Sequence, residues 1–221
     1  MTLLGLVLPS RCAACGVPGS SLCDACRALL VRIAPPVCDR CGCPGAWPVR
    51  RCVECGGRRL GFSRARAAVV YDARARALVS AWKERGRRDL AEILASIVAE
   101  VVARPRVDAV TFVPGDRERS RARSHVPAER LARALAELWC LPFEHALERV
   151  GTAPRQARLP RAERGANVRN AFVAVARPPP PSVLLVDDIY TTGATVAACA
   201  GALRRAGAGS VEVVCLARAV R

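Results

Sequence analysis

Residues 183–200 read VLLVDDIYTTGATVAACA, and this stretch decides the fold of the chain. Its first four residues, 183–186, form an unbroken apolar run, which is typical of a strand buried on both faces. Asp187 and Asp188 follow directly and are expected to stop that strand. The stretch therefore predicts a buried strand that ends in two adjacent carboxylates.

A hydroxyl-rich loop and a helix follow the acidic pair. After the loop 189–195 (IYTTGAT), Val196, Cys199, Ala200 and Leu203 recur at the spacing of one helix face. Small residues at a helix N-terminus leave backbone N–H groups free at the positive end of the helix dipole, which favours a bound anion. Because two carboxylates suit a pair of vicinal hydroxyls, the unit predicts a site for a ribose 5-phosphate. The alternative is an ordinary strand capped by a polar turn.

The cysteines indicate metal binding near the N-terminus. Nine of the twelve lie between Cys12 and Cys55, and eight of these form four Cys-x-x-Cys pairs. Each pair can aim two thiolates at one ion, so four pairs suit two structural zinc ions. Sequential pairing is the simplest arrangement, and a crossed pairing stays open. The predicted ligands are Cys12, Cys15, Cys23, Cys26, Cys38, Cys41, Cys52 and Cys55.

The remaining cysteines and the first residues complete this interpretation. Cys43 is a spare thiol, whereas Cys140, Cys199 and Cys215 lie in apolar patterns and are expected in the core. Clustered Cys-x-x-Cys pairs favour metal in a reducing compartment over disulfides, which predicts a cytoplasmic protein. The apolar run 3–9 is too short to cross a bilayer, so we expect no membrane span and interpret the run as a docking segment.

Composition bounds the size and the partners. With 221 residues the chain can hold one ordinary domain and a small module. Its net charge of +16 is carried almost wholly by arginine, because Lys83 is the only lysine. Such a balance favours polyanionic partners, either nucleic acid or a phosphorylated substrate. The alternative is that the arginines reflect the base composition of the genome, which would explain the same charge without any partner.

The rest of the chain alternates predicted strands and helices. This order predicts an α/β fold with a largely parallel sheet and helices on both faces. We divide the chain into a Cys-rich module at 1–60 and an α/β domain at 61–221. Pro127 opens one predicted helix, with Leu131, Leu135 and Leu138 on its buried side. Further helices are expected at 75–85 and from 90 to Pro105, and strands at 67–71, 107–113, 172–176, 183–186 and 211–217.

The acidic pair and its loop resemble the signature with which type I phosphoribosyltransferases bind 5-phosphoribosyl 1-pyrophosphate (PRPP). The resemblance implies that Asp187 and Asp188 hold the ribose hydroxyls and that Mg²⁺ accompanies PRPP. It also implies that the basic segment 114–125 meets the pyrophosphate and that residues 151–172 close over the substrate. The 5′-phosphate would be held by Thr191, Thr192, Gly193, Ala194 and Thr195, and the pyrophosphate by Lys83, Arg121 and Arg123.

The whole arrangement resembles the ComF family, which joins an N-terminal double zinc ribbon to a phosphoribosyltransferase-like domain. Residues 82–87 (WKERGR) and the segment from Gln156 to Phe172 add to the resemblance, whereas RSHV at 123–126 replaces the family's Arg-Gly-Phe-Asn-like run. The resemblance implies one of two functions. The protein either transfers phosphoribosyl from PRPP to a nucleobase-like acceptor, or assists DNA uptake by contacting single-stranded DNA and competence proteins. Neither histidine, His125 or His145, is an evident general base.

Overall fold

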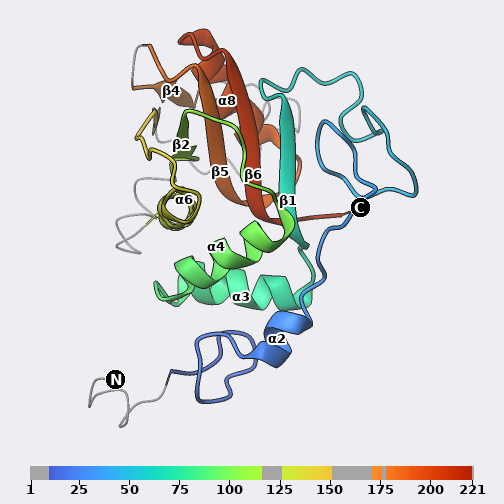
Figure 1. Cartoon of the computed structure of the whole chain (residues 1–221), viewed down its shortest axis with the longest axis vertical. Helices are drawn as coiled ribbons and strands as arrows, with labels where there is room; N and C mark the ends of the chain where they lie inside the picture. Colours follow the sequence, from blue (N-terminus) through green and yellow to red (C-terminus); the bar gives the residue numbers. More distant parts are fainter. Residues whose placement is uncertain (1–9, 116–125, 151–170, 176–177, 221) are drawn as a thin grey trace, which may run out of the picture.

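A parallel four-stranded sheet forms the centre of the computed structural model, which describes residues 10–115, 126–150, 171–175 and 178–220 (Figure 1). The sheet consists of β1 (Arg64–Val70), β2 (Ala109–Phe112), β5 (Ser182–Tyr190) and β6 (Ser210–Arg218). Its spatial order is β1-β6-β5-β2, and every neighbouring pair is parallel. The predicted parallel sheet is therefore confirmed. Predictions for Arg121, Arg123, the run 3–9 and the closing segment 151–170 lie outside the described residues.

Helices cover both faces of the sheet, as predicted. On one face α3 (Ala73–Glu84), α4 (Leu90–Val101) and α6 (Pro127–Leu138) share a buried apolar cluster with β2 and β5. On the other face α8 (Ala194–Arg205) packs in a second cluster. The apolar residues of β5 are divided between these two clusters, because successive side chains of a strand point to opposite faces.

A small antiparallel sheet lies beside α8. It pairs β3 (Leu147–Arg149) with β4 (Phe172–Ala174). We expected a strand at 172–176, but not its partner β3. Three residues are too few to show a strand pattern in the sequence, so only the pairing reveals this element.

The main correction concerns the end of β5. The strand continues through Asp187 and Asp188 to Tyr190, and its pairing with β6 runs in register as far as Arg218. The two carboxylates therefore do not stop the strand, because pairing with β6 continues to supply hydrogen-bond partners for the backbone N–H and C=O groups of β5. The acidic pair therefore lies within the last four residues of the strand rather than beyond its end.

Two residues near the end of α6 are more exposed than expected. Leu131 and Leu135 are buried, but Leu138 is 51% exposed, so its predicted place in the core is wrong. The helix ends there, and Trp139 fills the buried position instead. Cys140 follows in a turn with a φ of 49° and is exposed, which also contradicts its predicted core position. Cys199 and Cys215 are buried, as expected.

The Cys-rich segment divides between the two apolar clusters, and Figure 1 shows its first part near α3 and its second part beyond β1. Residues 10–32, here called the first ribbon, include α2 (Asp24–Ala28) and pack with α3 and α4. Residues 37–60, the second ribbon, pack in the cluster of α8. Between them the chain runs along β1, where the N–H of Ile33 donates to the carbonyl of Ala68 at 2.9 Å. Among the described residues, no helix has both the length and the apolar character that crossing a membrane requires.

Candidate functional site

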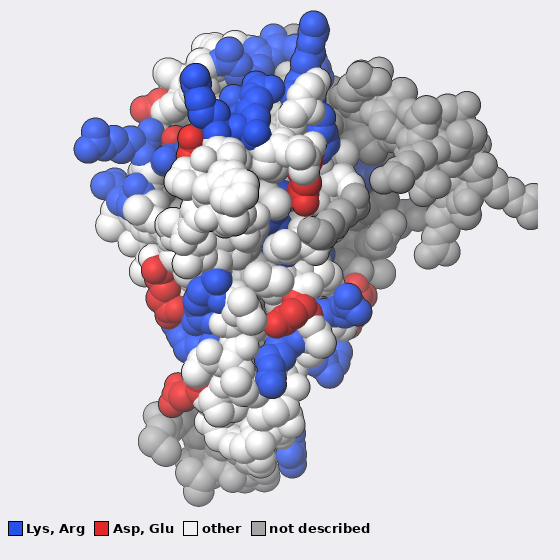
Figure 2. Space-filling model, turned by 90° about the vertical axis from the view of Figure 1, so that its right-hand side faces the viewer, with Lys and Arg blue, Asp and Glu red and all other residues white. Residues whose placement is uncertain are grey.

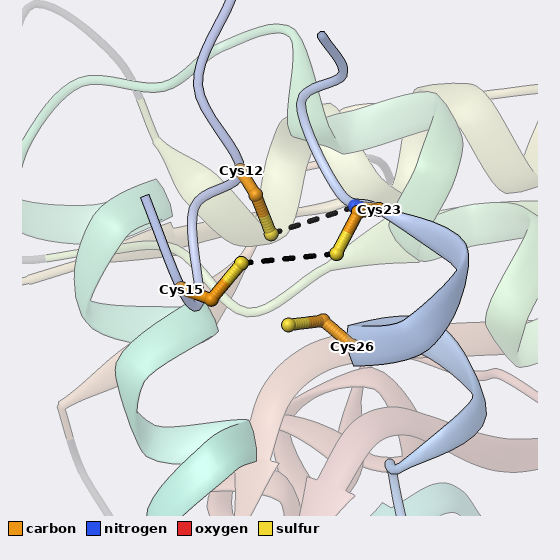
Figure 3. Close-up of side chains that lie close together, drawn as sticks. All are labelled: Cys12, Cys15, Cys23 and Cys26. Carbon is orange, nitrogen blue, oxygen red and sulfur yellow. Dashed lines mark hydrogen bonds between the residues drawn. The ribbon is translucent and has the colours of Figure 1, made fainter. Parts of the chain in front are cut away.

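The first ribbon brings four thiols together. The sulfurs of Cys12, Cys15, Cys23 and Cys26 all lie within 4.8 Å of one another and point toward a common centre (Figure 3). The sulfurs of Cys15 and Cys23 are 3.8 Å apart. A tetrahedral ion with zinc–sulfur bonds of about 2.3 Å would separate its sulfurs by about 3.8 Å. The first ribbon therefore fits a four-cysteine zinc site.

The second ribbon repeats this geometry with its own four cysteines. The sulfurs of Cys38 and Cys55 are 3.6 Å apart and those of Cys41 and Cys52 are 3.5 Å apart. All four lie within 4.8 Å of one another. The two groups follow the sequential pairing, which contradicts the crossed alternative. All twelve cysteines are free, and Cys43 belongs to neither group.

Backbone N–H groups prepare one thiol of each site for metal. Burial alone would raise the pKa of Cys12, but N–H groups that donate to its sulfur, including that of Cys23, lower it to about 6. In the same way Cys38 is buried, but N–H groups that include those of Cys41 and Cys52 lower its pKa to about 7. Because zinc binds the thiolate, these donors favour one deprotonated ligand in each site, whereas burial raises the pKa of Cys26 to about 12 and also raises those of Cys41 and Cys55.

A pocket of about 370 Å³ opens at the carboxyl ends of β2 and β5. Its walls include residues at the start of α8, where the sequence predicted an anion site, and residues at the start of α6. Two helix N-termini at one pocket favour a strongly negative ligand. The pocket is lined by Lys83, Val113, Pro114, Gly115, Val126, Pro127, Ala128, Arg149, Asp187, Asp188, Ile189, Thr191 and Thr195.

The two carboxylates in this pocket differ in their surroundings. Asp188 forms an ion pair with Lys83, with Oδ2 and Nζ 2.5 Å apart. Asp187 accepts a hydrogen bond from the N–H of Asp188 at 2.9 Å. Burial, and then the charge of Asp188, raise the pKa of Asp187 well above its ordinary value. The pair therefore contains one carboxylate that is already paired and one that ligand hydroxyls could stabilise in its charged form.

The loop 191–195 depends on one glycine. Gly193 has a φ of 71°, in the left-handed region that favours glycine, and α8 begins directly after it. A Cβ at this position would lie 2.2 Å from the hydroxyl oxygen of Tyr190. Gly193 provides no side-chain cap, so the first turn of α8 leaves N–H groups available for an anion. Thr192 Oγ1 accepts a hydrogen bond from the N–H of Ala194 at 3.3 Å.

Most of the predicted site residues that the structure describes meet at this pocket. Of the predicted PRPP-binding residues, Asp187, Asp188, Thr191 and Thr195 line it, and so does Lys83. Thr192 is exposed beside it, while Gly193 is buried under Tyr190.

The sequence did not predict one of the residues that line the pocket. Arg149 lines the pocket and was not anticipated, because a lone arginine in a three-residue strand gives no sequence signal. His145 is not among the lining residues and contacts Glu129 and Arg133 instead.

The chain thus combines two four-cysteine ribbon sites with a phosphoribosyltransferase-like sheet whose carboxyl edge carries an acidic pair and the loop that leads into α8. Residues 3–56 match the family model of a double zinc ribbon domain. The chain belongs to the ComF family. It is 30% identical to the DNA utilization protein YhgH of Salmonella typhimurium over 226 residues, covering 96% of this chain and 99% of that protein. It is also 27% identical to the competence protein ComFC of Streptococcus pneumoniae over 202 residues, 90% of this chain and 88% of that one.

Among solved structures, the chain is similar to glutamine PRPP amidotransferase from B. subtilis. That match has 26% sequence identity and a TM-score of 0.39, and it covers 58% of this chain. It spans 26% of the amidotransferase chain. A second similar structure, that of the allosteric regulatory enzyme of purine biosynthesis, has 26% sequence identity and a TM-score of 0.41, and the match covers 58% of this chain and 25% of that chain.

Proposed function

We propose that this protein binds PRPP in the pocket at the carboxyl edge of β5 and transfers its phosphoribosyl group to a nucleobase-like acceptor. The observation that carries the proposal is the convergence of an acidic pair and two helix N-termini on one pocket. A ribose 5-phosphate with a pyrophosphate at C1 needs hydroxyl acceptors beside two anion sites. The names of the solved relatives, which include a PRPP amidotransferase, are in keeping with this ligand.

Each group has a role in the proposed reaction. Asp187 and Asp188 accept hydrogen bonds from the ribose hydroxyls, and the backbone N–H groups of 191–195 hold the 5′-phosphate. Lys83, which lines the pocket and pairs with Asp188, is the proposed contact of the pyrophosphate. Mg²⁺ would enter with PRPP, and the pocket carboxylates are of the oxygen type that this ion accepts. When bound, Mg²⁺ neutralises charge on the pyrophosphate.

The transfer itself breaks the bond between C1 of the ribose and the pyrophosphate and forms a bond from C1 to the acceptor nitrogen. The pyrophosphate leaves with the bonding electron pair, and the acceptor loses its proton to solvent. Positive charge develops on the ribose ring, so the chain's contribution is to position the ribose and to stabilise the leaving anion.

The test replaces the acidic pair. Charge-assisted hydrogen bonds contribute about 1.5–3 kcal/mol each, so Asp187→Asn with Asp188→Asn should weaken PRPP binding at least about tenfold. Calorimetric titration of PRPP with Mg²⁺ measures this, and release of pyrophosphate with candidate bases measures transfer. Asp108→Asn is the matched control, because Asp108 contacts Ser182 at the opposite end of β5. Equal affinities for wild type and the double variant would overturn the proposed site.

A second candidate function, binding of single-stranded DNA, is favoured by the surface of the second ribbon. A basin of about 620 Å³ there is lined by Asp39, Arg40, Arg50, Arg51 and Ser63. Lys and Arg side chains gather in the upper part of the side that Figure 2 shows. Trp47, in the same ribbon, is 70% exposed. Arginines that follow a phosphate backbone and an aromatic ring on which bases stack are the two elements of sequence-tolerant single-strand binding.

Salt dependence tests this second function. Each phosphate neutralised on a single strand contributes about 0.7 to the log–log slope of affinity against salt, so Arg50→Ala with Arg51→Ala should reduce the slope by about 1.4. Arg104→Ala with Arg106→Ala removes the same charge from two exposed arginines at a distance from the ribbon in sequence. Equal slopes for the two double variants, or no binding of a labelled oligonucleotide, would contradict DNA binding by the second ribbon. The positive charge would then reflect amino-acid composition alone.

We also propose a cytoplasmic location, since a reducing compartment keeps eight thiols available for zinc. Residues 1–60 and 61–221 are the proposed modules. Competence proteins are proposed as partners because the similar protein of Streptococcus pneumoniae is a competence protein.

A further inference from the structure

A buried arginine joins the second ribbon to the end of β5. Arg218, at the end of β6, is 1% exposed. Its Nη1 donates to the carbonyl of Cys41 at 2.6 Å, and its Nη2 lies 2.5 Å from Oε2 of Glu54 and 3.7 Å from the sulfur of Cys41. Both partners belong to the second ribbon, and Cys41 is one of its four clustered cysteines. The ribbon therefore supplies acceptors for both terminal nitrogens of the guanidinium, whereas its buried Nε has no hydrogen-bond partner among the described residues.

The same arginine supports the aromatic ring under the loop. Its guanidinium carbon lies 4.4 Å from the centre of the Tyr190 ring, within the range of a cation–π contact. Tyr190 in turn fills the space beside Gly193, since a Cβ there would meet its hydroxyl oxygen at 2.2 Å. A continuous chain of contacts thus runs from the four-cysteine centre through Arg218 and Tyr190 to the loop 191–195.

A second contact reaches the loop directly. Arg58 Nη1 donates to the carbonyl of Thr192 at 2.7 Å and also to the carbonyl of Glu54 at 3.3 Å. The N–H of Arg58 donates to the carbonyl of Cys55 at 3.3 Å, so its backbone is tied to another clustered cysteine. Two arginines from different parts of the sequence therefore connect one ribbon to one loop.

We propose that Arg218 and Arg58 are positioning residues through which the second four-cysteine centre sets the conformation of the loop 191–195. A guanidinium as buried as that of Arg218 is strongly disfavoured without its partners. If the second ribbon unfolds, Arg218 must move toward solvent, and Tyr190 and Gly193 lose the contacts that fix them. The consequence for ligand binding rests on the proposed function of this loop, but the structural coupling does not.

Hydrogen exchange followed by mass spectrometry tests the coupling on the zinc-loaded full chain without PRPP. In Arg58→Ala and in Arg218→Gln, peptides covering 187–196 should exchange about tenfold faster than in wild type, while peptides from α6 stay unchanged. Arg59→Ala is the matched control, because Arg59 is exposed and adjacent to Arg58. Arg58→Lys, which restores one donor, should recover most of the protection.

The outcomes separate this inference from the proposed function. Loop exchange in Arg58→Ala and Arg218→Gln equal to that in Arg59→Ala overturns the coupling, as does faster exchange throughout the chain. If Arg218→Gln does not fold, the Arg58 variants decide. A parallel calorimetric titration should show PRPP binding weakened about fivefold in Arg58→Ala. If wild type binds no PRPP but the exchange pattern appears, the proposed function fails and the coupling stands.

Discussion

The two ribbons have the same cysteine chemistry but different attachments. The first ribbon meets α3 and the residues after it: Arg85 donates to the carbonyl of Ala13 at 3.0 Å and Arg87 to that of Arg11 at 2.7 Å. The second ribbon instead holds a buried arginine of β6 and the carbonyl of Thr192. The first therefore packs on the helical layer, and the second on the edge that carries the loop.

The difference in burial shows what each attachment contributes. Arg27 and Arg32 of the first ribbon pair with Glu100, but all three side chains are at least 28% exposed. Exposed ion pairs contribute about 0–1 kcal/mol, so the first ribbon is held mainly by its apolar residues. The contacts of Arg218 are buried, and their loss leaves a charge without partners. The same metal motif thus stabilises a helical face in one place and a loop in another.

The largest expected effect comes from removing one ligand of each site. Cys52→Ser and Cys15→Ser should each lower the zinc content from two ions per chain to one. Cys52→Ser should also weaken PRPP binding roughly 30-fold, by about 2 kcal/mol, because Arg218 and Arg58 lose their contacts with the second ribbon. Elemental analysis and calorimetry measure the two results.

Cys15→Ser should act mainly on folding. We expect it to lower the melting temperature but to weaken PRPP binding less than about threefold. Equal losses of affinity in the two serine variants would remove the distinction between the ribbons. Protein purified without added metal that holds disulfides in place of zinc would contradict the metal sites themselves.

A smaller effect is expected at Gly193. An alanine in the left-handed region costs about 1–2 kcal/mol, and its methyl group would also displace the hydroxyl of Tyr190. Gly193→Ala should therefore weaken PRPP binding about tenfold. Gly207→Ala is the control at the other end of α8, because its φ is 114° but its added Cβ has no atom nearer than 4.0 Å. That variant should be less stable with unchanged affinity; equal affinities for both would show that Tyr190 does not shape the loop.

The smallest effect is the pH dependence set by Asp187. Its pKa is raised by burial and by Asp188, so the folded chain binds more protons than the unfolded one, and its contribution to stability is lost as pH rises above the ordinary value of 3.8. Ribose hydroxyls favour the charged carboxylate, so PRPP binding should release a proton and strengthen as pH rises, by at most about tenfold per unit. Calorimetry over a series of pH values, in two buffers of different ionisation enthalpy, detects the proton, and the same titration of Asp187→Asn separates it from the protons of the PRPP phosphates. No proton release, or weaker binding at higher pH, would contradict this assignment.

The sequence predicts the parts of this site that are continuous along the chain. Residues 183–200 carry strand, acidic pair, loop and helix in one run, and each Cys-x-x-Cys pair is local. The predicted end of β5 was wrong because the strand is extended by its pairing with β6, which depends on residues 210–218. Leu138 was misplaced because helical spacing does not show where the helix ends and Trp139 takes over the buried position.

Contacts between distant segments were not predictable from pattern. Arg218 lies 177 residues from Cys41, and Arg58 lies 134 residues from Thr192. One arginine among many carries no signal of burial, and in sequence Arg218 ends an ordinary apolar strand. The sheet order, which brings β6 beside β5, is what places Arg218 next to Tyr190.

The most direct test of the account is a crystal structure of the zinc-loaded chain with PRPP and Mg²⁺. The account predicts the ribose hydroxyls at Asp187 and Asp188, the 5′-phosphate at the N–H groups of 191–195, and Arg218 still bound to Glu54. PRPP found instead in the arginine basin of the second ribbon, or a loop that binds phosphate after breaking its contact with Arg58, would contradict it.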